Sequence, residues 1–152
     1  AEQKQKVADW GLDSAVDFVG EVDRQHKVDF LAGLDVFSVP TVYREPKGLP
    51  VLEAMAAGVP VVQPRHGAFP EWIEHTGGGI LVEPLSPPAL AEGLRQLVED
   101  RELRQSLGRQ GRAAALEKFS HHAAADDMLK VYERVLEGES VEGEEARMSA
   151  VG

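Results

Sequence analysis

The sequence predicts an α/β fold: a Rossmann-like doubly wound parallel sheet followed by a helical C-terminus. Between residues 15 and 82, short apolar runs rich in Val and Ile, or bounded by Gly and Pro, alternate with stretches of helical pattern. Strands joined in this way by helices are typical of parallel sheets. Such sheets bind ligands at the carboxyl ends of their strands, so the loops that follow the strands are the candidate sites.

Four segments carry strand signals. Val opens and closes each of the first two, a proline after Gly58 opens the third, and the glycine run 77–79 leads into the fourth. The predicted strands are Val16–Val19, Val36–Val39, Pro60–Gln63 and Gly79–Val82, with helices near residues 2–11, 24–33, 50–57 and 70–75 between or before them.

Three more helices are expected after the last strand. Ser86 should cap a helix that opens with Pro87-Pro88 and carries leucines at helical spacing. Residues 101–118 follow as a helix despite two internal glycines, and Phe119-Ser120 starts the last one. We expect the arginines of the middle helix to form a solvated, ion-paired strip: Arg104, Arg109 and Arg112.

The start of the helix near residues 50–57 has the features of an anion site. Proline stands at a favoured first position and Gly58 marks the end. Gly48 or Leu49 would be the N-cap, and neither has a side-chain oxygen for the free amides of the first turn. We therefore expect the amides of Leu49, Val51 and Leu52, and the positive end of the helix dipole, to face a ligand such as phosphate.

Glu45 and Glu53 stand eight positions apart across this turn. Both carboxylates should border one pocket, where they would suit the hydroxyl groups of a sugar, while Leu49, Leu52 and Ala56 face a core. Spacing alone leaves a second interpretation open, in which water satisfies the helix end and both glutamates are solvated surface charges.

A second turn between a strand and a helix, QPRHGAFPEWIEH, repeats this arrangement. It contains the flexible Gly67, and Pro70 opens a short helix. Two helix starts would then face one crevice. We assign no ligand role to His66, because a loop histidine of an acidic protein is more often solvated.

Residues 44–94 resemble the donor-binding half of a retaining glycosyltransferase of family 4 (group 1), which has the GT-B fold. The resemblance extends from about Val16 to about Leu136. It rests on the E-x7-E pair Glu45 and Glu53, the GLP turn, the EAMA helix with its closing glycine, the GxPE-like turn that ends at Glu71, and the GILV strand.

The resemblance implies a role for each matching position. Glu45 would stand at the catalytic centre and hold hydroxyls of the donor sugar, and Glu53 would hold the ribose hydroxyls. The backbone of Gly48 and Leu49 would contact the diphosphate or the sugar. In this family the leaving diphosphate is thought to act as the base, so Glu45 need not be a nucleophile.

The resemblance also places Val22 and Lys27 near the nucleobase. Pro46-Lys47 departs from the family, which often has a small residue and an aromatic there, so Lys47 receives no role. A nucleotide-sugar is the expected partner. No metal or other cofactor is expected, because the sequence has neither Asp-x-Asp nor Cys/His metal spacing.

The first residues resemble the helix that leads into the third strand of the family's donor domain. We therefore expect residues 1–136 to be an incomplete C-terminal GT-B domain that lacks its first two strands and is inactive alone. In this family the strands of the sheet lie in the order 3-2-1-4-5-6. Without the first two strands, Val16–Val19 would have no neighbour and the edge of Val36–Val39 would be exposed. The expected consequences are a strand-exchanged homodimer, repacking of Val16–Val19, or dependence on the missing N-terminal part of the parent protein.

Composition limits the classes of partner and of cellular compartment that remain. The 152 residues fit one domain, and the net charge of −10 disfavours nucleic acid as a partner. The absence of cysteine fits a reducing compartment, so the cytoplasm is expected. No apolar run is long enough to span a membrane. Residues 137–152 form an acidic tail for which we expect disorder.

Two alternatives to a transferase stay open. One is a noncatalytic nucleotide-binding or protein-interaction module that keeps this half of the fold. The other is a fragment of a GT-B sugar-nucleotide epimerase, whose water-activating acids cannot be identified in this sequence.

Overall fold

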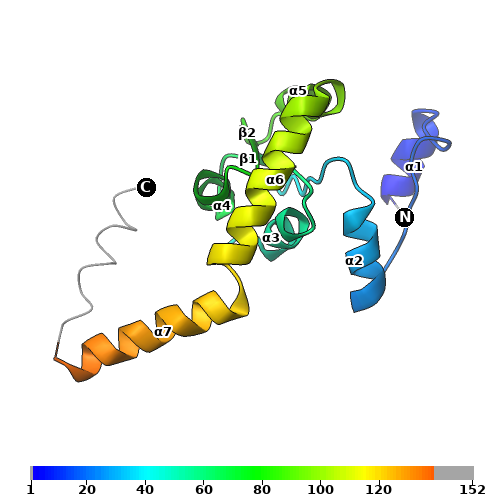
Figure 1. Cartoon of the computed structure of the whole chain (residues 1–152). Coiled ribbons are helices and arrows are strands. Elements are labelled where there is room, and N and C mark those ends of the chain that lie inside the picture. Colours follow the sequence, from blue (N-terminus) through cyan, green and yellow to red (C-terminus); the bar gives the residue numbers. More distant parts are fainter. Residues whose placement is uncertain (1, 139–152) are drawn as a thin grey trace. The chain divides into compact units, whose positions relative to one another are not determined.

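The computed structural model describes residues 2–138, which contain seven helices and two strands (Figure 1). The chain divides into two compact units, with the boundary between Phe30 and Leu31. Each unit is described by itself below. Of the predicted acidic tail, only Glu137 and Gly138 lie within the described residues.

The first unit contains helix α1 (Glu2–Asp9) and most of helix α2 (Arg24–Ala32). The predicted strand Val16–Val19 is wrong: these residues have no regular structure. A strand needs a hydrogen-bonded neighbour, and no other segment described in this unit is a strand. Lys4 Nζ lies 5.2 Å from the centre of the Phe18 ring, so this segment packs against α1 through a cation–π contact.

The second unit is built on a parallel pair of strands, β1 (Val61–Pro64) and β2 (Gly79–Val82). Val61 pairs with Gly79 and Pro64 with Val82. The prediction of the β2 strand is confirmed at both ends, and the strand predicted at Pro60–Gln63 begins one residue later. All four residues of β1 are buried, as expected for a strand covered on both faces.

The predicted strand Val36–Val39 is reduced to a single bridge between Phe37 and Val61. Around this bridge Phe37 N–H donates to Pro60 O (3.0 Å), and Val62 N–H donates to Phe37 O (3.0 Å). Side chains then replace the ladder: Ser38 Oγ donates to Val62 O (2.7 Å), and Val39 N–H donates to Gln63 Oε1 (3.2 Å). The segment therefore runs beside β1 in the order 36–39, β1, β2, held by two backbone hydrogen bonds at the bridge and by two bonds that involve the side chains of Ser38 and Gln63.

Five helices complete the second unit, and α3 to α6 contact the two strands or one another. They match the predicted helices within about one residue at most ends, because caps and turns are local signals. Ser86 and Ser120 accept hydrogen bonds from the first turns of α5 and α7, as N-caps do. The helices are α3 (Leu49–Ala56), α4 (Phe69–Thr76), α5 (Pro87–Glu99), α6 (Arg101–Lys118) and α7 (His121–Leu136).

The core lies where α3, α4 and α6 pack against one another and against the two strands. Its largest fully buried side chains include Phe69, Met55 and Val51. Helix α6 crosses this core on two glycines. A side-chain carbon at Gly108 would lie 2.4 Å from the carbonyl oxygen of Gly58, and one at Gly111 would lie 2.9 Å from Gly78 Cα. The two glycines therefore permit a backbone approach that a larger residue would block.

The arginines of α6 do more than form a solvated strip. Arg104 donates to the carbonyls of Leu97 and Val98 (2.9 Å each) at the end of α5. Arg112 donates to the carbonyl of Ala56 at the end of α3. Both guanidinium groups thus satisfy carbonyls at the negative ends of helices.

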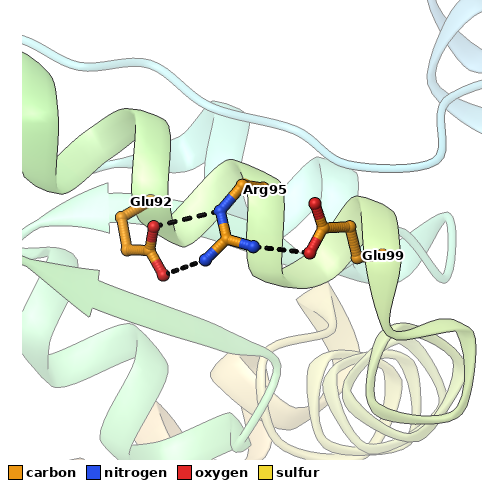
Figure 2. Close-up of polar contacts among 3 residues, drawn as sticks. All are labelled: Glu92, Arg95 and Glu99. Carbon is orange, nitrogen blue, oxygen red and sulfur yellow. Dashed lines mark hydrogen bonds and ion pairs between the residues drawn. The ribbon is translucent and has the colours of Figure 1, made fainter.

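On the exposed face of α5, one arginine forms ion pairs with two glutamates (Figure 2). Arg95 pairs with Glu92 and Glu99 at 2.5 Å each. The hydrogen bond from Arg95, reinforced by its charge, lowers the pKa of the Glu92 carboxyl.

Among the described residues, no helix combines the length and the apolar character that a membrane span needs.

Candidate functional site

The candidate site is formed by two turns of the second unit. The first turn connects the 36–39 segment to α3, and the second connects β1 to α4. Both turns follow the carboxyl ends of neighbouring parallel segments, which is where α/β sheets bind ligands.

Glu45 is held at the start of α3 by backbone amides. Its Oε1 accepts from Lys47 N–H and Gly48 N–H, at 3.2 Å each. These amides, Gly48 first and Lys47 second, hold the pKa of the Glu45 carboxyl below its usual range; the Tyr43 side chain adds a smaller effect, and partial desolvation opposes them. Glu45 is therefore an ionised acceptor beside the helix start.

At the start of α3 the predicted uncapped N-terminus is present, but one of the amides that was predicted to face a ligand is bonded within the turn. Gly48 is the N-cap, with a φ of 63°, and no side chain caps the helix. Val51 N–H, however, donates to Gly48 O (2.9 Å), so the prediction that this amide faces a ligand is wrong. The bond forms because the first turn tightens and satisfies its own amide.

The apolar face of α3 is also rotated from the predicted one. Leu49 was expected in the core, but its side chain is 55% exposed. Val51, Ala54 and Met55 are buried instead, and two of the three residues predicted to face the core, Leu52 and Ala56, pack at its edge. Leu49 therefore lies at the surface next to the turn. Glu53 is exposed on α3, eight positions after Glu45.

The second turn fixes the position of Glu45. Ala68 N–H donates to Glu45 O at 2.9 Å. Gly67 lies against the same residue, since a side-chain carbon there would be 2.5 Å from Glu45 O and 2.7 Å from Glu45 N. Only glycine fits this approach, and it also adopts the φ of 59° without strain.

His66 joins the two turns as well. Its Nε2 lies 2.9 Å from the carbonyl oxygen of Thr41, and since a carbonyl only accepts, Nε2 carries the proton. The Nδ1 atom is buried and has no partner among the described residues. His66 is therefore a structural link between the loops and not the solvated residue that we expected.

Sequence reasoning missed Trp72 of α4. Its Nε1–H donates to the carbonyl of Lys47 at 2.6 Å, and its ring packs edge-on against Phe119, with ring centres 5.0 Å apart. The sequence offered only a general signal, namely that the N–H of a tryptophan usually finds an acceptor when its ring packs, and no spacing rule names that acceptor.

The remaining predicted residues, Val22 and Lys27, belong to the first unit. Val22 precedes α2, and Lys27 lies within α2. Their proposed place near a nucleobase stays a prediction. Within residues 2–138 no group of three His, Cys, Asp or Glu side chains is arranged to hold a metal ion.

A cavity of about 300 Å³ lies beside the first turn, at the carboxyl ends of β1 and β2. Pro40, Val42, Pro64 and Val82 give it a mainly apolar lining, and Glu83 is its charged residue. The cavity does not include Glu45.

The parallel strands, the helices around them and the turn before α3 form the fold of the C-terminal domain of GT-B glycosyltransferases. The chain belongs to the family described as Glycosyl transferases group 1, whose sequence model matches residues 1–114.

Two curated relatives are similar over most of the chain. An uncharacterized glycosyltransferase of Methanocaldococcus jannaschii is 34% identical over 127 residues, which cover 84% of this chain and 32% of that protein. The MMP alpha-(1->4)-mannosyltransferase of Mycolicibacterium hassiacum is 35% identical over 132 residues, which cover 86% of this chain and 32% of that protein. The chain thus spans about a third of the length of these relatives.

Three solved structures have the same fold. Sucrose-phosphate synthase from Thermosynechococcus elongatus has a TM-score of 0.80 at 29% identity, over 91% of this chain and 34% of that one. HepE from Anabaena in complex with UDP has a TM-score of 0.78 at 26% identity, over 87% of this chain and 36% of that one. The C-terminal domain of the group 1 protein LpcC from Francisella tularensis has a TM-score of 0.71 at 34% identity, over 79% and 62%.

Proposed function

We propose that this chain is the donor-binding part of a retaining glycosyltransferase of family 4, which transfers a sugar from a nucleotide-sugar to an acceptor hydroxyl. The observation that carries the proposal is the Glu45 carboxylate, held by two amides at the start of α3. The structural relative HepE has been solved with UDP-glucose, which supports a nucleotide-sugar as the ligand.

In this proposal the residues divide the donor between them. Glu45 accepts hydrogen bonds from hydroxyls of the sugar, and the exposed Glu53 accepts them from the ribose. The backbone of Gly48 and Leu49 faces the diphosphate or the sugar. Ionised carboxylates suit these roles because they only accept, and each sugar hydroxyl has a proton to donate.

The start of α3 would supply the electrostatic part of catalysis. Charge grows on the leaving phosphate as the bond to the anomeric carbon breaks. The positive end of the helix dipole and the amide of Leu49 would stabilise that charge, whereas Val51 N–H already donates to Gly48 O. One well-placed donor of this kind contributes roughly 10²–10³ in rate.

We propose that sugar transfer needs a longer protein, of which this chain is one part. The chain spans about a third of its relatives, so we propose that it supplies the donor side and does not transfer sugar alone. We also propose that no metal takes part, because the sequence has no Asp-x-Asp pair, and that the protein works in the cytoplasm, because it has no cysteine.

Titration calorimetry with UDP, GDP and ADP, and with their glucose or mannose conjugates, tests the proposal. Glu53→Ala should weaken binding of the nucleotide-sugar about 10- to 100-fold, the size expected for hydrogen bonds to a charged group. Because Glu53 is exposed, its loss should leave the melting temperature nearly unchanged.

Glu117→Ala is the matched control, since it removes an exposed glutamate that belongs to α6 and to neither turn. Equal binding by the wild type and Glu53→Ala would remove the donor-site assignment. If neither this chain nor a longer parent binds any nucleotide, the noncatalytic interaction module becomes the better interpretation.

A further inference from the structure

The peptide unit between Lys47 and Gly48 is held at both of its polar ends. Its carbonyl oxygen, on Lys47, accepts from Trp72 Nε1–H at 2.6 Å. Its N–H, on Gly48, donates to Glu45 Oε1 at 3.2 Å. Because a trans peptide is planar and its C=O and N–H point in opposite directions, a partner that fixes one end also orients the other.

This peptide depends on outside contacts for its orientation. Gly48 has a φ of 63° and no side chain, so its own sterics permit several orientations of the turn. The Trp72 ring covers it: a side-chain carbon at Gly48 would lie 2.9 Å from Nε1 and 3.0 Å from Cδ1 of the indole. The indole thus contacts Gly48 and also holds the carbonyl next to it.

Trp72 is itself held by rigid neighbours. It lies on α4, which packs against α6 and β2. Its ring meets the Phe119 ring edge-on, at an interplanar angle of 83°. A tryptophan N–H only donates, so the Lys47 carbonyl is a partner that suits it.

We propose that Trp72 is a positioning residue for the candidate donor site: its indole N–H holds the Lys47 carbonyl and so keeps the Gly48 N–H directed at the Glu45 carboxylate. Trp72 acts through the turn and does not touch the donor. The effect on donor binding rests on the proposed function, whereas the effect on Glu45 does not.

The first test measures Glu45 directly in this chain. Carbon-13 NMR follows the titration of its carboxyl group in the wild type, in Trp72→Phe and in Trp10→Phe. Trp72→Phe keeps an aromatic ring but removes the N–H, so the pKa of Glu45 should rise. Trp10→Phe is the matched control, because Trp10 is the other tryptophan of the chain and is 70% exposed.

The second test is a double-mutant cycle with UDP-glucose as the probe. Trp72→Phe should weaken binding about threefold to tenfold, the size expected from one hydrogen bond. In the Glu45→Gln background the same change should have less than about a twofold effect, because positioning acts through Glu45. A purely structural role of Trp72 would weaken binding equally in both backgrounds.

The outcomes separate the two proposals. If neither the wild type nor a longer parent binds a nucleotide-sugar, the proposed function fails, and the titration of Glu45 still decides the role of Trp72. An unchanged Glu45 pKa in Trp72→Phe overturns the positioning role. Should Trp72→Phe not fold, benzothienylalanine at position 72 keeps the shape of the indole, lacks its N–H, and allows the same titration.

Discussion

At the scale of single residues, the site is defined by how backbone groups surround one carboxylate. Glu45 is exposed enough to reach a ligand, yet its oxygen already accepts from two amides, and its own backbone accepts from Ala68 N–H. A ligand hydroxyl would therefore meet a carboxylate whose position and ionisation are set before binding. Such preorganisation reduces the cost of ordering the site when the ligand arrives.

The lowered pKa of Glu45 predicts how stability depends on pH. A carboxyl with a lowered folded-state pKa contributes stability above the unfolded pKa of about 4.3, and that stability is lost as the pH falls through the folded-state value. The wild type should therefore melt higher than Glu45→Gln at pH 6, and the difference should shrink between about pH 5 and pH 3. Thermal unfolding at each pH measures it, with Glu117→Gln as the control; a difference independent of pH would contradict the prediction.

Gly67 gives a prediction about the contact between the two turns. Gly67→Ala should destabilise the protein, because the new methyl group would overlap the backbone of Glu45. Gly58→Ala is the control: its φ is also positive, 86°, but its methyl group would meet only ordinary contacts at 3.7 Å. We expect a cost of about 1–2 kcal/mol for Gly58→Ala from backbone strain. Gly67→Ala should cost about 1–3 kcal/mol more. Equal costs in chemical denaturation would mean that the loop moves freely away from Glu45.

At the scale of elements, close backbone contacts decide how α6 crosses the sheet. Gly111→Ala tests this. By helix propensity alone the change would stabilise α6 by about 1 kcal/mol. The new methyl group, however, would lie 2.9 Å from Gly78 Cα, a backbone atom that cannot turn away. We expect a net destabilisation of about 1–3 kcal/mol in urea unfolding. A more stable variant would show that α6 does not depend on this approach.

The elements that sequence patterns predicted well are those specified by local signals. Ser86 and Ser120 cap their helices from neighbouring positions, and Gly48 with Pro50 marks the start of α3 within three residues. The strand predicted at Val16–Val19 failed because pairing needs a distant neighbour, which apolar composition does not reveal.

The same division between local and distant contacts explains the site. Glu45 and the uncapped start of α3 were visible in the sequence because the relevant residues are adjacent. The contact of Trp72 with Lys47 and that of His66 with Thr41 each join residues 25 positions apart. No spacing rule links such pairs, so their roles emerged only from the folded chain.

At the scale of the whole molecule, the feature that calls for explanation is the apolar surface of α7. None of its residues is buried. Large apolar side chains nonetheless recur along it at helical spacing. The large apolar residues of α7 whose exposed fraction is 50% or more are Met128, Leu129, Tyr132, Val135 and Leu136. A contiguous apolar surface of this kind marks a place where another surface binds.

We therefore predict that this chain self-associates through α7 when no other partner covers it. In light scattering the weight-average mass should rise above 16.5 kDa with concentration. The double variant Leu129→Gln and Leu136→Gln should stay monomeric, because each change forfeits the burial of a leucine that association would remove from water, worth about 1.5–3 kcal/mol per leucine when fully buried. Glu133→Gln, on the same helix, is the control and should associate like the wild type. Association that persists in the leucine variant would instead implicate the edge of residues 36–39, the route expected for strand exchange, and a monomer at all concentrations would contradict both.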